Sequence, residues 1–353
     1  MNKLLERKFW EKATNKDVQK VLDEGADVNA RDEYGNVPLC LALECDIEPQ
    51  ELLAMLLDAG ADVNTRDQYG ITPLHHVIEL DVSQEVSGVT QEVLAMLLNK
   101  GANVNVGDQG GYTPLHYAVA FKVTLEVIKI LIKAGADVNA RDREGRPPLY
   151  YAIERNVKQE VFALLLNNGA DVNARYKGEN TPLHIAVALN LKQEVLALLL
   201  SKGADVNARS KGGNTPLHSL QGGATREMLT MLLDAGADVN ARNQNGGTLL
   251  HHASEKGVTQ EVLTMLLDAG ADVNARDLDG MSPMHYAAYG SSLQHDTLIE
   301  VLLKGGADTN ARNKDGKTPF ELFKEGKEED ELKSRKAYWQ LWSAGLNQRD
   351  KIR

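Results

Sequence analysis

The sequence predicts an all-α fold in which short helix pairs recur along the chain. Two strings of residues lead to this prediction. GADVNARD at 25–32 returns eight more times in related form, at spacings of 33–36 residues with one of 41. TPLH at 72–75 and its variants recur in the same phase. The 353 residues therefore form an array of one small unit and not two or three unrelated globular domains.

Each part of the repeat has a physical explanation. In TPLH, Thr can cap a helix by accepting backbone N–H bonds, and Pro suits the first helical position, where no N–H is needed. A second helix follows, as in 258–270, where Val262, Leu263, Leu266 and Leu267 place apolar groups on two flanks. Gly270 can end that helix in the left-handed conformation. Neither flank can be buried within one repeat, so stability must come from stacking.

The residues between the helix pairs are polar and rich in turn formers. The DxxG string, as in 277–280, predicts a tight turn at the tip of a projecting finger. The Asn of GADVN is expected to tighten the turn after the second helix. One repeat is thus a finger followed by two helices.

These nine phased copies resemble the ankyrin repeat family. The resemblance covers nearly the whole chain and implies an ankyrin-repeat solenoid, with a β-hairpin finger and an antiparallel helix pair in each repeat. It divides the chain into an N-terminal capping half-repeat at 1–31, eight full repeats, and a C-terminal capping repeat with a terminal helix at 313–353. The full repeats span 32–66, 67–107, 108–141, 142–175, 176–209, 210–242, 243–276 and 277–312.

Two segments depart from the pattern. In the second full repeat, VSQEV at 82–86 is followed by VTQEV at 89–93, and the intervening Gly88 favours a longer inter-helix loop over a lengthened helix. In the C-terminal segment, Leu332, Trp339, Trp342 and Leu346 recur at helical spacing. They predict either a helix that covers the last repeat or an amphipathic element that docks on a partner.

Composition excludes several classes of function. The formal charge of −11 disfavours nucleic-acid binding, which needs clustered Lys and Arg. No apolar run is long enough to cross a bilayer, and the charged start lacks a secretory signal. Two cysteines fit a reducing compartment. We expect a cytoplasmic monomer, or a protein delivered into a host cytosol by an intracellular bacterium or virus.

No catalytic, cofactor or metal site is predicted. Six of the nine histidines occupy the TPLH slot, where the ring can bond the cap hydroxyl and the backbone of the adjoining repeat, which is its role in the family. The pairs His75–His76 and His251–His252 are far apart, and adjacent helical residues do not face one another. The cysteines Cys40 and Cys45 have no catalytic setting, and no nucleophile, phosphate-binding or zinc motif occurs.

Residues that differ between copies are the candidates for recognition. The resemblance places finger tips and first-helix ends on a concave face where partners dock. The predicted partner-binding residues are Tyr34, Tyr69, Tyr112, Phe121, Arg143, Arg146, Arg155, Tyr176, Lys177 and Leu189. The aromatic members and Leu189 are expected to form an exposed, broken apolar stripe, because exposed aromatic groups are enriched at binding hot spots.

Two functions remain open. The first is a non-enzymatic scaffold that binds a partner protein on its concave finger and first-helix surface. The second is an adaptor or targeting subunit whose C-terminal cap recruits an effector enzyme such as a ligase or phosphatase.

Overall fold

The computed structural model describes residues 2–44, 49–83, 87–220, 225–256, 258–289, 293–325, 336, 338 and 340–344. Regular secondary structure in these residues is helical, without a strand, as the predicted all-α class requires. None of the described helices has the length and apolar character needed to cross a membrane. The chain divides into two compact units, Met1–Tyr176 and Lys177–Arg353.

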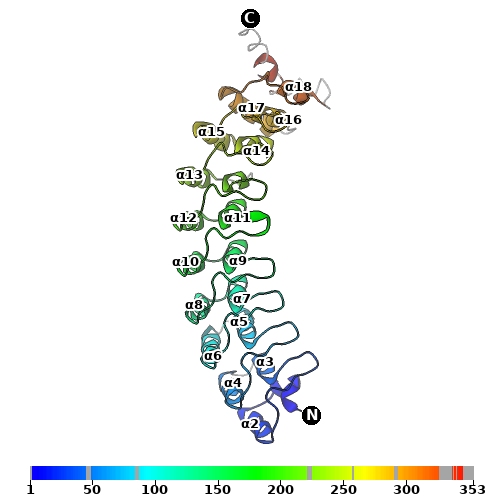
Figure 1. The fold of residues 1–353 in the computed structure, drawn as a ribbon, viewed down its shortest axis with the longest axis vertical. Helices are drawn as coiled ribbons and strands as arrows, with labels where there is room; N and C mark the ends of the chain where they lie inside the picture. Colours follow the sequence, from blue (N-terminus) through cyan, green and yellow to red (C-terminus); the bar gives the residue numbers. More distant parts are fainter. Residues whose placement is uncertain are drawn as a thin grey trace. The chain divides into compact units, whose positions relative to one another are not determined.

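The first unit contains two columns of helices (Figure 1). First helices pack on the next first helix, and second helices on the next second helix. The first column holds α3 (Pro38–Leu43), α5 (Pro73–Ser83), α7 (Pro114–Ala120) and α9 (Pro148–Glu154). The second column holds α2 (Asn15–Asp23), α4 (Pro49–Asp58), α6 (Ser87–Asn99), α8 (Leu125–Lys133) and α10 (Gln159–Asn167). At the N-terminus, η1 (Lys3–Leu5) and α1 (Arg7–Trp10) pack beside α3.

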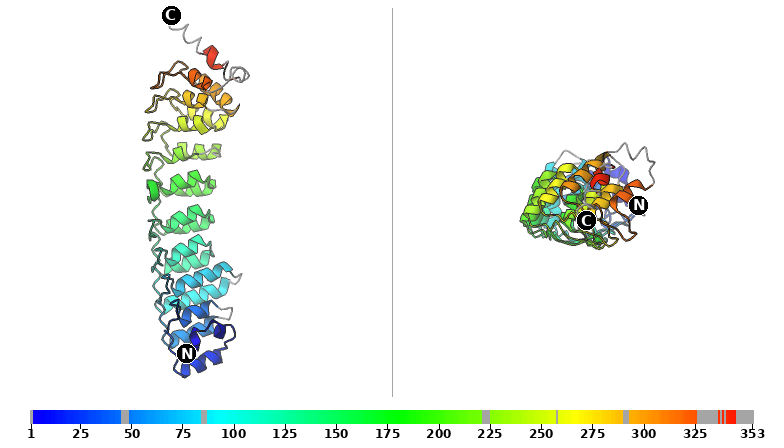
Figure 2. Two further views of the ribbon diagram at one scale, coloured as in Figure 1. Left: turned by 90° about the vertical axis from the view of Figure 1, so that its right-hand side faces the viewer. Right: turned by 90° about the horizontal axis from the view of Figure 1, so that it is seen from above.

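The second unit repeats this arrangement. Its first column is α11 (Pro182–Ala188), η3 (Pro216–Ser219), α14 (Leu249–Lys256), α16 (Pro283–Tyr289) and α18 (Pro319–Lys324). Its second column is α12 (Gln193–Ser201), α13 (Arg226–Asp234), α15 (Gln260–Asp268) and α17 (Leu293–Lys304). A short η2 (Lys177–Glu179) begins the unit. In each unit the finger turns lie along one edge of the helix stack (Figures 1 and 2).

The helix starts are capped as the sequence predicts, with His as a further member of the cap. In α7, Pro114 occupies the first turn, and the Thr113 side chain accepts from the backbone of His116. The His116 Nδ1 accepts the Thr113 backbone N–H at 3.1 Å. This leaves Nε2 to carry the ring proton and to donate to the Arg146 carbonyl at 3.0 Å. One ring thus caps its own helix and bonds to the next repeat.

The fingers are tight turns, and the strands of the expected β-hairpins do not occur in the described residues. In the finger at 142–146, the backbone N–H of Asp142 donates to the Arg146 carbonyl at 3.1 Å. The Asp142 carboxylate also accepts the backbone N–H groups of Glu144 and Arg146 at 2.8 and 2.9 Å. Gly145 adopts φ 78°, which favours glycine. A single cross-finger pairing is too short to be a strand.

The Asn of GADVN does more than tighten a local turn, which corrects the sequence-based expectation. Asn139 donates through Nδ2 to the Gly169 carbonyl at 2.8 Å and accepts the Asp171 backbone N–H at 2.8 Å. Both partners belong to the next repeat, so this side chain holds successive repeats in register. The Arg of the same string acts similarly: Arg31 donates to the carbonyls of Gly35 and Arg66 at 3.0 and 2.6 Å.

The helices on both sides of the insert in the second repeat are lengthened, so the prediction of a longer loop is wrong as far as the structure describes it. Helix α5 has 11 residues and α6 has 13, against 7 and 9 in α7 and α8. Gly88 lies within α6, and only 84–86 fall outside the described residues of this segment. A single glycine near the start of a helix costs roughly 1 kcal/mol, which the remaining turns of α6 tolerate.

The described residues of the terminal helix pack on α18, and Lys336 donates to Glu300 of the preceding repeat at 2.6 Å. Residues 340–344 are helical and Leu341 is buried, while the Tyr338 ring lies 5.4 Å from that of Phe320. Trp342 is 45% exposed. Leu332, Trp339 and Leu346 lie outside the described residues.

Candidate functional site

The histidines of the TPLH motif, which we call the slot histidines, have a structural role. Each bonds the hydroxyl of its own helix cap at 2.8–2.9 Å and a backbone carbonyl of the following repeat at 2.9–3.4 Å. They are His75, His116, His184, His218, His251 and His285. Burial lowers the pKa of His75 and of His218 to about 4. Burial also lowers the pKa of His116, His251 and His285, so these five rings are neutral at pH 7. In all six, both ring nitrogens are occupied by the hydrogen bonds that their position in the motif predicts.

The remaining candidates for chemistry have no arrangement that fits it. Cys40 is buried, and burial raises the pKa of its thiol to about 12, so it is not a thiolate. Cys45 lies outside the described residues. Across the described parts of the chain, no three or more His, Cys, Asp or Glu side chains gather in a way that could hold a metal ion.

The most organised group of side chains on the finger and first-helix face is an aromatic group in the first unit, which we call the tyrosine cluster. Its ring pairs have centroids 5.1–6.3 Å apart, within the usual range for aromatic contacts. The cluster consists of Tyr112, Tyr117, Phe121, Tyr150, Tyr151 and Tyr176. It extends from the finger at 108–112 along α7 and across α9.

Arg146 holds the centre of this cluster. Its Nε donates to the buried Asp142 carboxylate at 2.8 Å, and Nη2 donates to the Tyr112 hydroxyl at 2.8 Å. The guanidinium carbon lies 5.6 and 5.2 Å from the ring centres of Tyr150 and Tyr151. The Tyr151 hydroxyl donates to the same carboxylate at 2.6 Å. Finger and helix are thereby joined by one network of charge-assisted bonds.

The electrostatics of Asp142 reflect this network. Burial raises the pKa of the carboxyl, but hydrogen bonds from Tyr151 and Arg146 and the charge of Arg146 exceed that effect, so the pKa lies below its usual value. Burial and the hydrogen bond to Asp142 raise the pKa of Tyr151. The phenol stays protonated, and the carboxylate stays charged.

The predicted partner-binding residues differ in their exposure to solvent. Tyr34, Tyr69, Phe121 and Leu189 are 55%, 62%, 43% and 49% exposed. Arg143, Arg155 and Lys177 are also exposed, whereas Tyr112 and Arg146 are half-buried. Tyr176 is only 7% exposed, so its assignment to an exposed stripe is wrong: its ring packs 5.1 Å from Tyr150. Lys177 and Leu189 belong to the second unit, and the other eight to the first.

Sequence reasoning overlooked Tyr117, Tyr150 and Tyr151. A usable signal was present for two of them, because a Tyr nine residues after the Asp of the finger places its hydroxyl on that carboxylate. Tyr117 bonds Asp108 at 3.0 Å and Tyr151 bonds Asp142 at 2.6 Å. In the second unit, Tyr286 bonds Asp277 at 2.7 Å. Tyr150 takes the position of the slot histidine and has no such signal.

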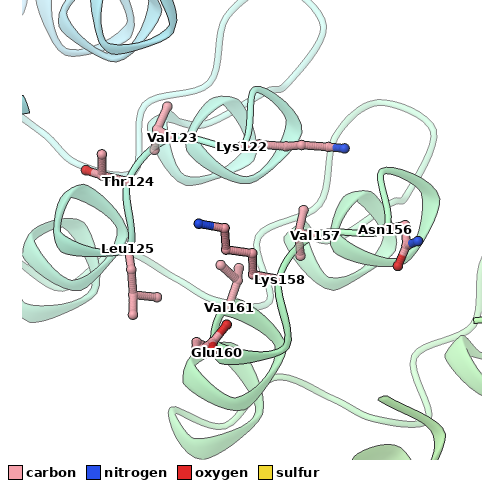
Figure 3. Close-up of a pocket in the computed structure, with 9 residues that line it drawn as sticks. All are labelled: Lys122, Val123, Thr124, Leu125, Asn156, Val157, Lys158, Glu160 and Val161. Atoms are coloured by element: carbon pink, nitrogen blue, oxygen red, sulfur yellow. The ribbon is translucent and has the colours of Figure 1, made fainter. Parts of the chain in front are cut away.

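A separate hollow of about 670 Å³ lies between the inter-helix turns of the third and fourth full repeats (Figure 3). Its polar lining includes Lys122, Thr124, Asn156, Lys158 and Glu160. Lys122 and Asn156 stand in corresponding turns with φ 58° and 47°. The lining brings no buried acid, base or nucleophile together, so the hollow is not an arrangement for catalysis.

The comparisons with known proteins agree with the repeat architecture. The sequence model of a family described as ankyrin repeats in three copies matches residues 49–142, 82–176, 123–211, 172–243 and 218–313. No curated protein matches the chain.

Proposed function

Because this chain belongs to the ankyrin repeat family, whose repeats generally mediate protein–protein interactions, we propose that it binds a partner protein on its finger and first-helix face. The proposed anchors lie in the first unit. They are the accessible members of the tyrosine cluster, with Arg143 and Arg155 at the edge. Arg146 is a positioning residue, because its guanidinium is occupied within the protein.

The tyrosine cluster is the observation that supports this proposal. Phe121 is 43% exposed, and Tyr112, Tyr117 and Tyr150 are half-buried. Tyr112 and Tyr150 contact the Arg146 guanidinium and are already ordered, so they lose little side-chain entropy when a partner covers them. Tyr is also among the residues most enriched at binding hot spots. A rigid, amphipathic surface of this kind suits recognition of a protein.

Site-specific photo-crosslinking in cells of the source organism tests the proposal. A photoreactive phenylalanine replaces Phe121 in one variant and the exposed Lys129 of α8 in a control. We expect a protein to crosslink from position 121 and not from 129, and the crosslink to disappear when Tyr150→Ala is added. Equal crosslinking from both positions, or a crosslink that survives Tyr150→Ala, would contradict this binding face.

An adaptor role is the second candidate, and the exposure of Trp342 supports it. Trp342 is 45% exposed beside the buried Leu341, so the helix at 340–344 has one packed and one accessible side. The adaptor would hold one protein on the fingers and an effector on this helix. Trp342→Ala should abolish capture of the effector bound at this helix. The protein that crosslinks from position 121 should still be captured. Loss of both, or of neither, would contradict two separate docking sites.

A further inference from the structure

The acidic charge of the chain is concentrated in the first two full repeats. Residues 32–107 contain thirteen acidic and two basic residues, a net charge equal to the −11 of the entire chain. The next segment, 108–175, contains eight acidic and nine basic residues and is almost neutral. The first unit therefore has a strongly acidic part beside the neutral part that holds the tyrosine cluster.

Two exposed aromatic rings lie on the finger tips of this acidic part. Tyr34 and Tyr69 are 55% and 62% exposed. Their fingers are adjacent, because the backbone N–H of Gln68 donates to the Tyr34 carbonyl at 3.3 Å. The Tyr69 carbonyl in turn accepts from Gln109 at 2.9 Å. The two rings thus occupy equivalent positions on successive fingers.

Carboxylates lie on the same face as the two rings. Glu33 precedes Tyr34 at the first finger tip, Glu44 lies at the C-terminal end of α3, and Glu79 lies within α5; all three are exposed. Burial and the neighbouring charges of Asp67 and Glu44 raise the pKa of Glu79. Burial is the larger cause, and the contribution of Asp67 and Glu44 shows that these carboxylates lie close enough to repel one another. Glu44 forms an ion pair with Arg7 at 2.7 Å, and that arginine is 68% exposed.

We propose that the finger and first-helix face of residues 32–107 binds a segment of a partner protein rich in lysine and arginine. The inference rests on the proposed function and adds the chemistry of the partner. An ammonium or guanidinium over an exposed tyrosine face gains a cation–π contact, and its charge is attracted by the carboxylates beside it. The cation–π contact and the charge attraction both favour a basic segment. An acidic segment or a nucleic-acid backbone meets like charge on this face.

The neutral part of the unit complements this inference. An occupant that places its basic residues on 32–107 can extend its apolar residues toward the tyrosine cluster, since both surfaces belong to the finger and first-helix face of one unit. The basic segment would then determine the rate of encounter and the orientation, and the apolar part most of the residence time.

The test is selection from a display library of random twelve-residue peptides on the full chain, followed by affinity measurements with the selected peptides. Two double variants remove the proposed contacts without disturbing the core: Glu33→Gln with Glu79→Gln, and Tyr34→Ala with Tyr69→Ala. The matched control is Glu126→Gln with Glu160→Gln, on the second helices of the neutral repeats. Circular dichroism verifies that all variants fold.

We expect the selected peptides to be rich in Lys and Arg. Each test pair should weaken their binding about 5- to 30-fold, the effect of two exposed charge or cation–π contacts, and the control pair less than about 2-fold. Binding should also weaken as NaCl rises from about 50 to about 500 mM. Selected peptides that are neutral or acidic, basic peptides indifferent to both test pairs, or no selection at all would overturn the inference.

The same experiment separates this inference from the proposed function. Peptides that lack basic residues and lose binding in Tyr150→Ala would overturn the acidic site while supporting the tyrosine cluster. Basic peptides that depend on Glu33 and Tyr69 but not on Tyr150 would support the acidic site and contradict the cluster as the main anchor.

Discussion

Replacing Arg146 by methionine tests whether this side chain organises the tyrosine cluster. Methionine keeps the apolar stem and removes the guanidinium. The Asp142 side chain is 0% exposed and that of Arg146 is 18% exposed, so the bond between them is shielded from solvent. Losing one charge-assisted hydrogen bond to a buried carboxylate costs about 1.5–3 kcal/mol. Losing the contacts with the rings of Tyr150 and Tyr151 adds about 0.5–1 kcal/mol.

The expected loss of about 2–4 kcal/mol is below the maximum for an orphaned buried charge. Asp142 keeps the Tyr151 hydroxyl and the backbone N–H groups of Glu144 and residue 146. Native-state hydrogen exchange of amides in α7 and α9 measures the loss locally, which avoids assuming that a repeat array unfolds in one step. Adding Asp142→Asn to the variant should recover part of the stability, because the unpaired charge is then removed.

Arg155→Met is the control, because Arg155 is exposed and should contribute less than about 0.5 kcal/mol. If Arg146→Met lowers protection no more than Arg155→Met does, the guanidinium does not organise the cluster, and the role given to it here is wrong.

Three further predictions concern stability. Burial lowers the pKa of His75 from 6.5 to about 4, so the neutral ring contributes fully to the free energy of unfolding above pH 6.5. That contribution is lost as the pH falls toward 4. The loss is about 3 kcal/mol, and the slope of unfolding free energy against pH should be shallower in His75→Asn. Lys122→Gly should stabilise the protein by about 1 kcal/mol, because Lys122 has φ 58°, which glycine adopts without strain. Lys129→Gly, within α8, should destabilise it by about 1 kcal/mol, and thermal unfolding measures both changes. Tyr176→Phe should raise stability by about 1–2 kcal/mol in urea unfolding, because the buried Tyr176 hydroxyl has no hydrogen-bond partner among the described residues. A loss of stability would show that it has one.

The sequence predicts the structure of one repeat well, because its fixed residues form hydrogen bonds with groups only a few positions away in the chain. Thr113, Pro114 and His116 cap α7 through bonds that span three residues, and Gly145 provides the positive φ of its finger turn. Local rules of this kind apply wherever the string occurs. The interactions between repeats were harder to predict, and Asn139 illustrates why. Its partners, Gly169 and Asp171, are about one repeat away, where a rule for local turns does not reach.

The candidate site was predicted only in part, because the exposure of a finger residue depends on what it packs against. Tyr69 lies in the middle of its finger turn and is 62% exposed, whereas Tyr176 takes the first position of its finger, which Asp67 and Asp142 hold in others, and is 7% exposed. Tyr176 packs there on the ring of Tyr150, which replaces the slot histidine one repeat earlier. A side chain of one repeat thus helps to cover a finger residue of the next. The variable positions of such a chain must be considered in pairs of adjacent repeats, and the partner-binding surface is a property of those pairs.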